Sequence, residues 1–129
     1  MKPIYSLAAA PALMAAVAVF AVPSGAQSTP AGGAQAFAMC AACHTVAKGG
    51  RNGIGPNLSG LIGRRAGSVP GFSYSPGMKS SGLTWDAKTL DQFLAAPAKK
   101  VPGTKMPISV SDPAKRAAVI AYLTTATAK

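Results

Sequence analysis

The two cysteines and the single histidine of this sequence lie within five consecutive positions, Cys40-Ala41-Ala42-Cys43-His44. Two thiols three positions apart lie about one helical turn apart, so both can reach the edge of one flat ring system. The residue that follows them is then placed beneath that ring, where an imidazole nitrogen can bind a metal. This spacing is the attachment signature of c-type haem, with Cys40 and Cys43 forming thioethers and His44 as an axial ligand.

Three other chemistries use cysteines at this spacing. An exported chain can form a disulfide between Cys40 and Cys43. A thioredoxin-like redox pair needs a βαβ setting that the sequence does not predict, and a zinc site needs further ligands. None of the three gives a role to the adjoining His44, so covalent haem is the favoured interpretation.

A haem iron has a second axial position, and a chain with one histidine can fill it with a methionine thioether. The sequence has five methionines. Two of them lie in the N-terminal apolar segment, Met39 adjoins the first cysteine and cannot reach the opposite face, and Met78 fits a core-filling role. Met106 lies in a loop flanked by prolines, which restrict the backbone and lower the entropy cost of aiming the sulfur. We therefore expect His44 and Met106 to ligate the iron.

No run of the sequence alternates convincingly between apolar and polar residues, so no substantial sheet is expected. Helices and loops must therefore position these side chains. Three main helices are expected, over residues 34–42, 84–95 and 113–125, with Thr84 as the N-cap of the second. Short helical turns are expected near residues 75–80 and 98–101. Glycine and proline between them predict long loops. With only 6% aromatic residues, such a chain needs a bound group to complete its core.

The first 26 residues have the pattern of a secretory signal peptide. Lys2 precedes an apolar run over residues 7–22, and small residues stand at Ser24 and Ala26. Cleavage near Ala26 would leave a flexible N-terminus over residues 27–33 and one domain over residues 34–129, located in the periplasm. The alternative is an uncleaved membrane anchor, although the apolar run is shorter than the ~20 residues that a bilayer span needs.

The chain is strongly basic, with 13 Lys and Arg against 3 Asp and Glu and a formal net charge of +10. The basic residues are scattered rather than collected in one run, and export also argues against nucleic acid as a partner. A large excess of one sign steers association with surfaces of the other sign. We therefore expect a monomer that docks on acidic protein surfaces, with at most peripheral membrane contact.

Several stretches, taken in order, resemble the class I cytochromes c, and most closely mitochondrial cytochrome c and its bacterial periplasmic homologues. Beyond the C-x-x-C-H motif they include Lys48-Gly49-Gly50, Gly55-Pro56-Asn57-Leu58, Gly82-Leu83-Thr84-Trp85, Pro102-Gly103-Thr104-Lys105-Met106 and Ile120-Ala121-Tyr122-Leu123. The resemblance covers residues 37–129. It implies an all-α, small cytochrome c fold, in which three main helices, short helical turns and long loops wrap around one covalently attached haem c.

The resemblance also implies roles for positions that match haem-contacting residues of the family, namely Pro56, Arg64, Tyr74, Trp85 and Thr104. The carbonyl of Pro56 would accept the ring N–H of His44 and fix that ligand. The arginine, tyrosine and tryptophan would bond the haem propionates, and the threonine hydroxyl would lie near the ligand sulfur.

Two positions depart from the family pattern. Phe93 stands where the family usually has a tyrosine that reaches the ligand sulfur, and Met78 stands where it often has a buried asparagine. Both changes remove polar groups, so we expect a drier site beside Met106.

A histidine and a methionine on the iron close it to substrate and favour electron transfer. We expect a soluble periplasmic electron carrier, not an enzyme, that moves one electron from a cytochrome bc-type donor to a terminal oxidase or other acceptor. The basic residues expected to ring the exposed haem edge are Lys48, Arg51, Lys99, Lys100 and Lys105. The alternative is a haem peroxidase or gas-binding protein in which Met106 is a labile ligand.

Overall fold

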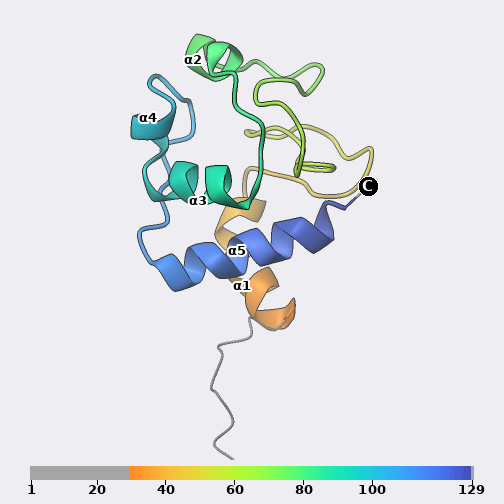
Figure 1. The fold of residues 1–129 in the computed structure, drawn as a ribbon. Helices are drawn as coiled ribbons and strands as arrows, with labels where there is room; N and C mark the ends of the chain where they lie inside the picture. The colour runs from red at the N-terminus through yellow and green to blue at the C-terminus, as the bar shows by residue number, and fades with distance from the viewer. Residues whose placement is uncertain (1–29, 129) are drawn as a thin grey trace, which may run out of the picture.

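The structure is a computed structural model that describes residues 30–128, apart from the side chains of Pro30 and Ala31. The helices in this range are α1 (Pro30–Ala41), α2 (Pro76–Ser80), α3 (Ala87–Ala95), α4 (Pro97–Lys100) and α5 (Pro113–Ala126). Across the same residues there is no strand, only an isolated antiparallel bridge between Arg65 and Thr84. The expected all-α fold with long loops is confirmed (Figure 1). The expected signal peptide lies outside the described residues.

Helices α1 and α5 cross in close contact at one end of the molecule (Figure 1). Gly33 permits the approach, because a Cβ atom there would lie only 2.9 Å from Cβ of Tyr122. The rings of Phe37 and Tyr122 pack beside it with centroids 5.0 Å apart. This packing outweighs the low helix propensity of glycine, so α1 starts before the expected residue 34. Residues 30–33 therefore belong to the helix rather than to the expected flexible terminus.

Helix α3 begins at a different cap from the expected one. Asp86, with φ −134° and ψ 176°, is the N-cap, and its carboxylate accepts the backbone N–H of Thr89 at 2.7 Å. Thr84 is unsuited to this role because its neighbours are paired with another segment. The N–H of Trp85 donates to the carbonyl of Arg64 at 2.9 Å. The expected cap at Thr84 was therefore wrong by two positions.

Helix α5 begins as the sequence predicts. Asp112 is its N-cap and accepts the backbone N–H groups of Ala114 and Lys115 at 2.8 and 3.4 Å. Pro113 occupies the first helical position, where its missing N–H costs nothing. Val119 and Leu123 turn the apolar side of the helix inward and are both almost fully buried.

The hydrophobic core is a shell rather than a filled centre. Twelve buried apolar residues form one cluster, and all of them except Ala66 and Val101 line a single cavity. Side chains from α1, α3, α5 and the loops between them contribute to its walls. Within residues 30–128, no helix has the length and apolar character needed to cross a bilayer.

Candidate functional site

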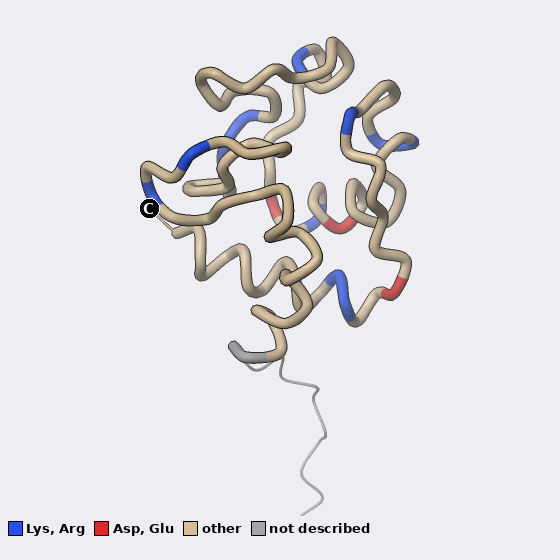
Figure 2. Tube along the Cα trace, turned by 180° about the vertical axis from the view of Figure 1, so that it is seen from behind, with Lys and Arg blue, Asp and Glu red and all other residues tan. Residues whose placement is uncertain are grey.

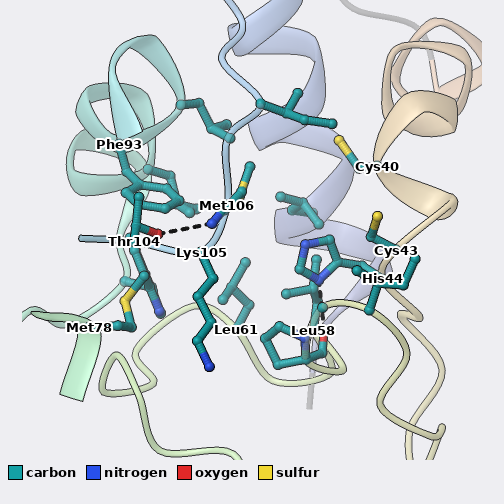
Figure 3. Close-up of a pocket in the computed structure, with 18 of the residues that line it drawn as sticks. Cys40, Cys43, His44, Leu58, Leu61, Met78, Phe93, Thr104, Lys105 and Met106 are labelled. Carbon is teal, nitrogen blue, oxygen red and sulfur yellow. Dashed lines mark hydrogen bonds between the residues drawn. The ribbon is translucent and has the colours of Figure 1, made fainter. Parts of the chain in front are cut away.

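The C-x-x-C-H segment forms the turn in which α1 ends. The carbonyl of Cys40 accepts the backbone N–H groups of Cys43 and His44 at 3.0 and 2.9 Å. All three side chains line the cavity and lie on one of its walls (Figure 3). The cysteines form no disulfide with each other. Burial raises the pKa of the Cys40 thiol, and the neighbouring Cys43 raises it further.

The imidazole of His44 is fixed by its own loop. Its Nδ1 lies 2.7 Å from the carbonyl oxygen of Pro56, which can only accept, so Nδ1 carries the proton. Nε2 makes no hydrogen bond to any residue of 30–128. Burial lowers the pKa of His44, and the positive charge of Arg64 acts in the same direction, while the bond to Pro56 opposes both. A neutral imidazole with Nε2 unprotonated is the form that binds a metal.

Gly55 and Asn57 lie in the loop that holds His44 and were given no role from the sequence. A Cβ atom on Gly55 would lie 2.7 Å from Nδ1 and 2.8 Å from Nε2 of the ring, so only glycine leaves room for the imidazole. Asn57 is buried, and its amide donates to the hydroxyl of Thr45 at 2.7 Å. The signal was present in the run Gly55-Pro56-Asn57, because asparagine in a glycine- and proline-rich loop often bonds the nearby backbone.

Met106 lies on the wall opposite His44, together with Phe93, Thr104 and Met78 (Figure 3). The backbone N–H of Met106 donates to Oγ1 of Thr104 at 3.3 Å. Phe93 and Met78 are buried and bring no nitrogen or oxygen to this wall. These two residues therefore add only apolar groups to the wall beside the methionine, and the drier site expected from them stays a prediction.

The polar part of the cavity is built around Arg64. Its two terminal nitrogens donate to the carbonyls of Ser59 and Asn57 at 2.7 and 3.1 Å. Its Nε is buried and is the one buried side-chain nitrogen or oxygen without a partner in the described part of the chain. Burial lowers the pKa of Arg64, but an arginine keeps its proton in proteins. A buried cationic N–H with no partner is suited to a carboxylate.

Tyr74 and Trp85 border the same part of the cavity. The hydroxyl of Tyr74 accepts the backbone N–H of Val69 at 3.2 Å, and burial raises its pKa. The indole of Trp85 packs edge-on against Phe93, with centroids 5.2 Å apart. Its N–H has no hydrogen-bond partner among residues 30–128. Both rings can therefore offer an O–H or N–H to an acceptor in the cavity.

Together these groups fit a c-type haem. Two thiols and an imidazole lie on one wall, a thioether lies on the opposite wall, and the rest is mostly apolar with one unpartnered cationic N–H. Within residues 30–128, no group of three or more His, Cys, Asp and Glu side chains is placed so that it could hold a metal ion by itself.

Comparison with known proteins agrees with this site. The family model described as Cytochrome c matches residues 30–127. Cytochrome c2 of Rhodomicrobium vannielii is 44% identical over 115 residues, which cover 88% of this chain and 92% of the relative. Cytochrome c2 iso-2 of Magnetospirillum fulvum is 52% identical over 89 residues, covering 68% and 92% of the two chains. Cytochrome cH from Methylobacterium extorquens superposes with a TM-score of 0.68 at 51% identity, covering 74% of this chain and 97% of the other.

The chain belongs to the cytochrome c family. Its fold is the small all-α cytochrome c fold, its cofactor is covalently attached haem c, and its class is that of electron-transfer proteins.

The structure brings all the site residues predicted from the sequence to one cavity. They are Cys40, Cys43, His44, Pro56, Arg64, Tyr74, Trp85, Thr104 and Met106. The basic residues expected around its edge are less concentrated. Lys105 lines the cavity and donates to the carbonyl of Ser73 at 3.0 Å, Lys99 borders an adjoining groove, and Lys100 bonds Gln92 of α3 at 2.7 Å. Lys48 and Arg51 are exposed but do not line it.

Proposed function

We propose that the protein is a soluble periplasmic carrier of single electrons, with Cys40 and Cys43 holding the haem and His44 and Met106 as the axial ligands. The placement of His44 and Met106 on opposite walls of one apolar cavity carries this proposal. When bound by these residues, the haem would supply the one-electron Fe(III)/Fe(II) couple that such a carrier needs. Two protein ligands leave no open position for a substrate.

The residues around the site keep it rigid between the two oxidation states. The bond from His44 to Pro56 fixes the imidazole. Thr104 holds the backbone of Met106. Arg64 offers its unpartnered Nε to a haem propionate. The apolar lining excludes water from the space between them. A site that changes little on reduction needs little reorganisation, which suits fast electron transfer.

The mouth of the cavity suits a transient protein interface. Met39, Ile54 and Ile108 border the cavity and are 47%, 81% and 39% exposed. Lys105 lies among them, and Lys and Arg are spread over the rest of the trace (Figure 2). An apolar centre with a basic surround fits an acidic redox partner, because opposite charges speed encounter without a large contact area.

We infer that the donor is a cytochrome bc-type complex and that the acceptor is a terminal oxidase or another redox protein. The support is the signal-peptide pattern of residues 1–26, which predicts export, together with the positive charge of the chain. Export to the periplasm would place the carrier beside membrane complexes, with peripheral contact at most.

The test of the ligation is the ferric optical spectrum of holoprotein from a host that attaches haem c. We expect the weak long-wavelength band of a methionine–Fe(III) bond. Met106→Ala should abolish that band, and Met78→Leu, the matched control from the same wall, should keep it. Haem bands without the methionine band in the native protein would contradict the proposal and would favour the peroxidase or gas-binding alternative.

The test of the docking surface is the salt dependence of electron transfer to an acidic redox protein. The bimolecular rate constant should fall several-fold between low and physiological ionic strength. Lys105→Gln should lower the rate constant at low salt more than Lys88→Gln, which removes the same charge from the exposed start of α3. Equal effects of the two substitutions would show that docking does not use this edge.

A further inference from the structure

The segment that carries Met106 has few attachments of its own. The Met106 loop, residues 101–112, connects α4 to α5 without regular structure. Before the methionine it is held by Val101, which is 1% exposed, by Thr104, and by Nζ of Lys105, which donates to the carbonyl of Ser73 at 3.0 Å. After it, Pro107, Ile108 and Ser109 make no hydrogen bond to any residue of 30–128. The next point at which the loop is attached is therefore Val110.

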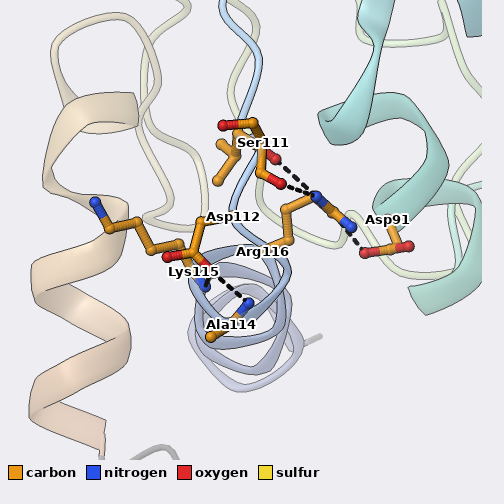
Figure 4. A network of polar contacts seen from close by, with 7 residues as sticks. Asp91, Ser111, Asp112, Ala114, Lys115 and Arg116 are labelled. Carbon is orange, nitrogen blue, oxygen red and sulfur yellow. Dashed lines mark hydrogen bonds and ion pairs between the residues drawn. The ribbon is translucent and has the colours of Figure 1, made fainter.

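Val110 is attached from two directions. Its N–H donates to the carbonyl of Leu94, at the end of α3, at 2.7 Å. Its own carbonyl and that of Ser111 both accept from one nitrogen of Arg116, Nη1, at 3.0 and 2.9 Å. Arg116 extends from the first turn of α5, so the exit of the Met106 loop is bonded to two helices (Figure 4).

The guanidinium of Arg116 is itself held in place. Its Nε donates to Oδ1 of Asp91 in α3 at 2.8 Å, the one ion pair in the described part of the chain. The arginine side chain is 12% exposed and the aspartate 48%. A half-exposed ion pair adds little stability by itself, but this one fixes the orientation of the planar guanidinium of Arg116. Lysine could not reproduce the arrangement, because its single nitrogen lacks that geometry.

We propose that Arg116, aimed by Asp91, is a positioning residue that keeps the thioether of Met106 on the haem iron. The proposal rests on the ligation by His44 and Met106 given under Proposed function. Residues 107–109 make no hydrogen bond to the described part of the chain. The bonds from Arg116 to the carbonyls of Val110 and Ser111 therefore oppose movement of the Met106 sulfur away from the site. Its role is therefore to limit opening of the Met106 loop, beyond any contribution to the stability of the whole fold.

Exogenous imidazole tests this role, because it can occupy the position of Met106 only when the loop opens. Ferric holoprotein is titrated with imidazole, and the loss of the long-wavelength methionine band gives an apparent affinity. Arg116→Lys, which keeps the charge, should raise that affinity roughly tenfold, as expected for the loss of one or two charge-assisted bonds. Asp91→Ala, at a half-exposed position that does not disturb the core, should raise it roughly threefold.

Two control variants separate loop opening from general effects. Lys115→Gln removes the neighbouring positive charge of α5, and Gly49→Ala strains an exposed left-handed position at φ +73° with open space around it. Gly49→Ala should lower the denaturant midpoint without changing imidazole affinity. The inference is overturned if Arg116→Lys and Asp91→Ala match these controls while the native protein shows the methionine band. Absence of that band in the native protein would overturn the proposed ligation and this inference with it.

Discussion

At the scale of single residues, the site depends on the absence of a side chain at Gly55 and of a hydroxyl at Phe93. Gly55 has no Cβ, and the imidazole of His44 occupies the space where one would lie. Phe93 has no hydroxyl, and it is almost fully buried on the wall that carries Met106. The first position leaves room for an iron ligand, and the second leaves the opposite ligand without a hydrogen-bond donor from this side chain.

Replacing Gly55 by alanine should displace the His44 ring, because the new methyl group would overlap it. We expect the stability of the holoprotein to fall by about 1–3 kcal/mol, as for other overpacked sites, and the haem absorption bands to shift. Gly71→Ala is the control, since a Cβ atom there would meet no other atom within 4 Å, although the φ of Gly71 is positive at +74°. That control should cost about 1 kcal/mol and leave the spectrum unchanged. A normal spectrum for Gly55→Ala would contradict the assigned role.

Replacing Phe93 by tyrosine should raise the reduction potential. A thioether sulfur can only accept, so a phenol beside it would donate, and the positive end of the O–H dipole would point towards the iron and favour Fe(II). A bond of about 1 kcal/mol corresponds to about 40 mV for a one-electron couple. Protein-film voltammetry of the two proteins measures the difference. An unchanged potential would mean that the hydroxyl does not reach the sulfur.

At the scale of elements, the helices are fixed at their ends by short polar side chains. Asp86 caps α3, Asp112 caps α5 and Ser75 caps α2. Since α3 and α5 each supply a wall of the cavity, a cap that fails would loosen the site as well as the helix. The cap of α3 is also the one for which a pH effect can be derived.

The hydrogen bond from the backbone of Thr89 lowers the pKa of Asp86 below its ordinary value. The ionised cap therefore stabilises the folded state above the unfolded-state pKa of about 3.9, and this contribution is lost as the pH falls through the lower folded-state value. Asp86→Asn keeps a capping oxygen but does not titrate. The free energy of unfolding of the native protein should thus fall, relative to that of Asp86→Asn, below about pH 4. Denaturant titrations between pH 7 and pH 2 would show it, and parallel curves would refute it.

Comparison of elements shows what the sequence could and could not predict. The C-x-x-C-H turn, the loop of Met106 and the start of α5 follow from local rules, and each lies where it was expected. The start of α1 was not predicted, because the close approach of Gly33 to Tyr122 of α5 is a tertiary contact that local rules do not include. The prediction of Thr84 as the cap of α3 was wrong for a similar reason. The backbone on either side of Thr84 is hydrogen-bonded in the pairing of residues 63–66 with 83–85.

The candidate site divides in the same way. Residues with distinctive chemistry, such as His44 and Met106, were found from their type and spacing. Asn57 and Arg116 were not, because their importance lies in the loop carbonyls to which their side chains donate once the chain has folded. An arginine near the start of a helix has the same local pattern whether it is solvated or bonded to a loop. Only the packing of α5 against α3 distinguishes the two cases.

At the scale of the whole molecule, the fold is incomplete without its cofactor. Ten of the twelve residues in the buried cluster line the cavity, so they pack against each other only around its rim. A chain of this size without a filled core is marginal. We therefore expect the fold, as well as the chemistry, to depend on haem.

A variant that cannot attach haem tests this dependence. Cys40→Ser with Cys43→Ser, purified without haem, should show weak helical circular dichroism and no cooperative thermal transition. The holoprotein should show both, and adding haem to the variant should restore part of the helical signal. A cooperative transition in the haem-free chain would mean that the shell of apolar residues can collapse on itself.

The three acidic residues of the chain are all committed to internal tasks: Asp86 and Asp112 begin helices and Asp91 aims Arg116. They offset only three of the 13 positive charges of Lys and Arg, which leaves the sequence with a formal net charge of +10. Two copies that meet therefore repel each other, and direct contact between their cavity mouths is disfavoured. We therefore expect electron exchange between identical copies to be slow, and each electron to stay with the copy that received it until that copy meets a surface of opposite charge.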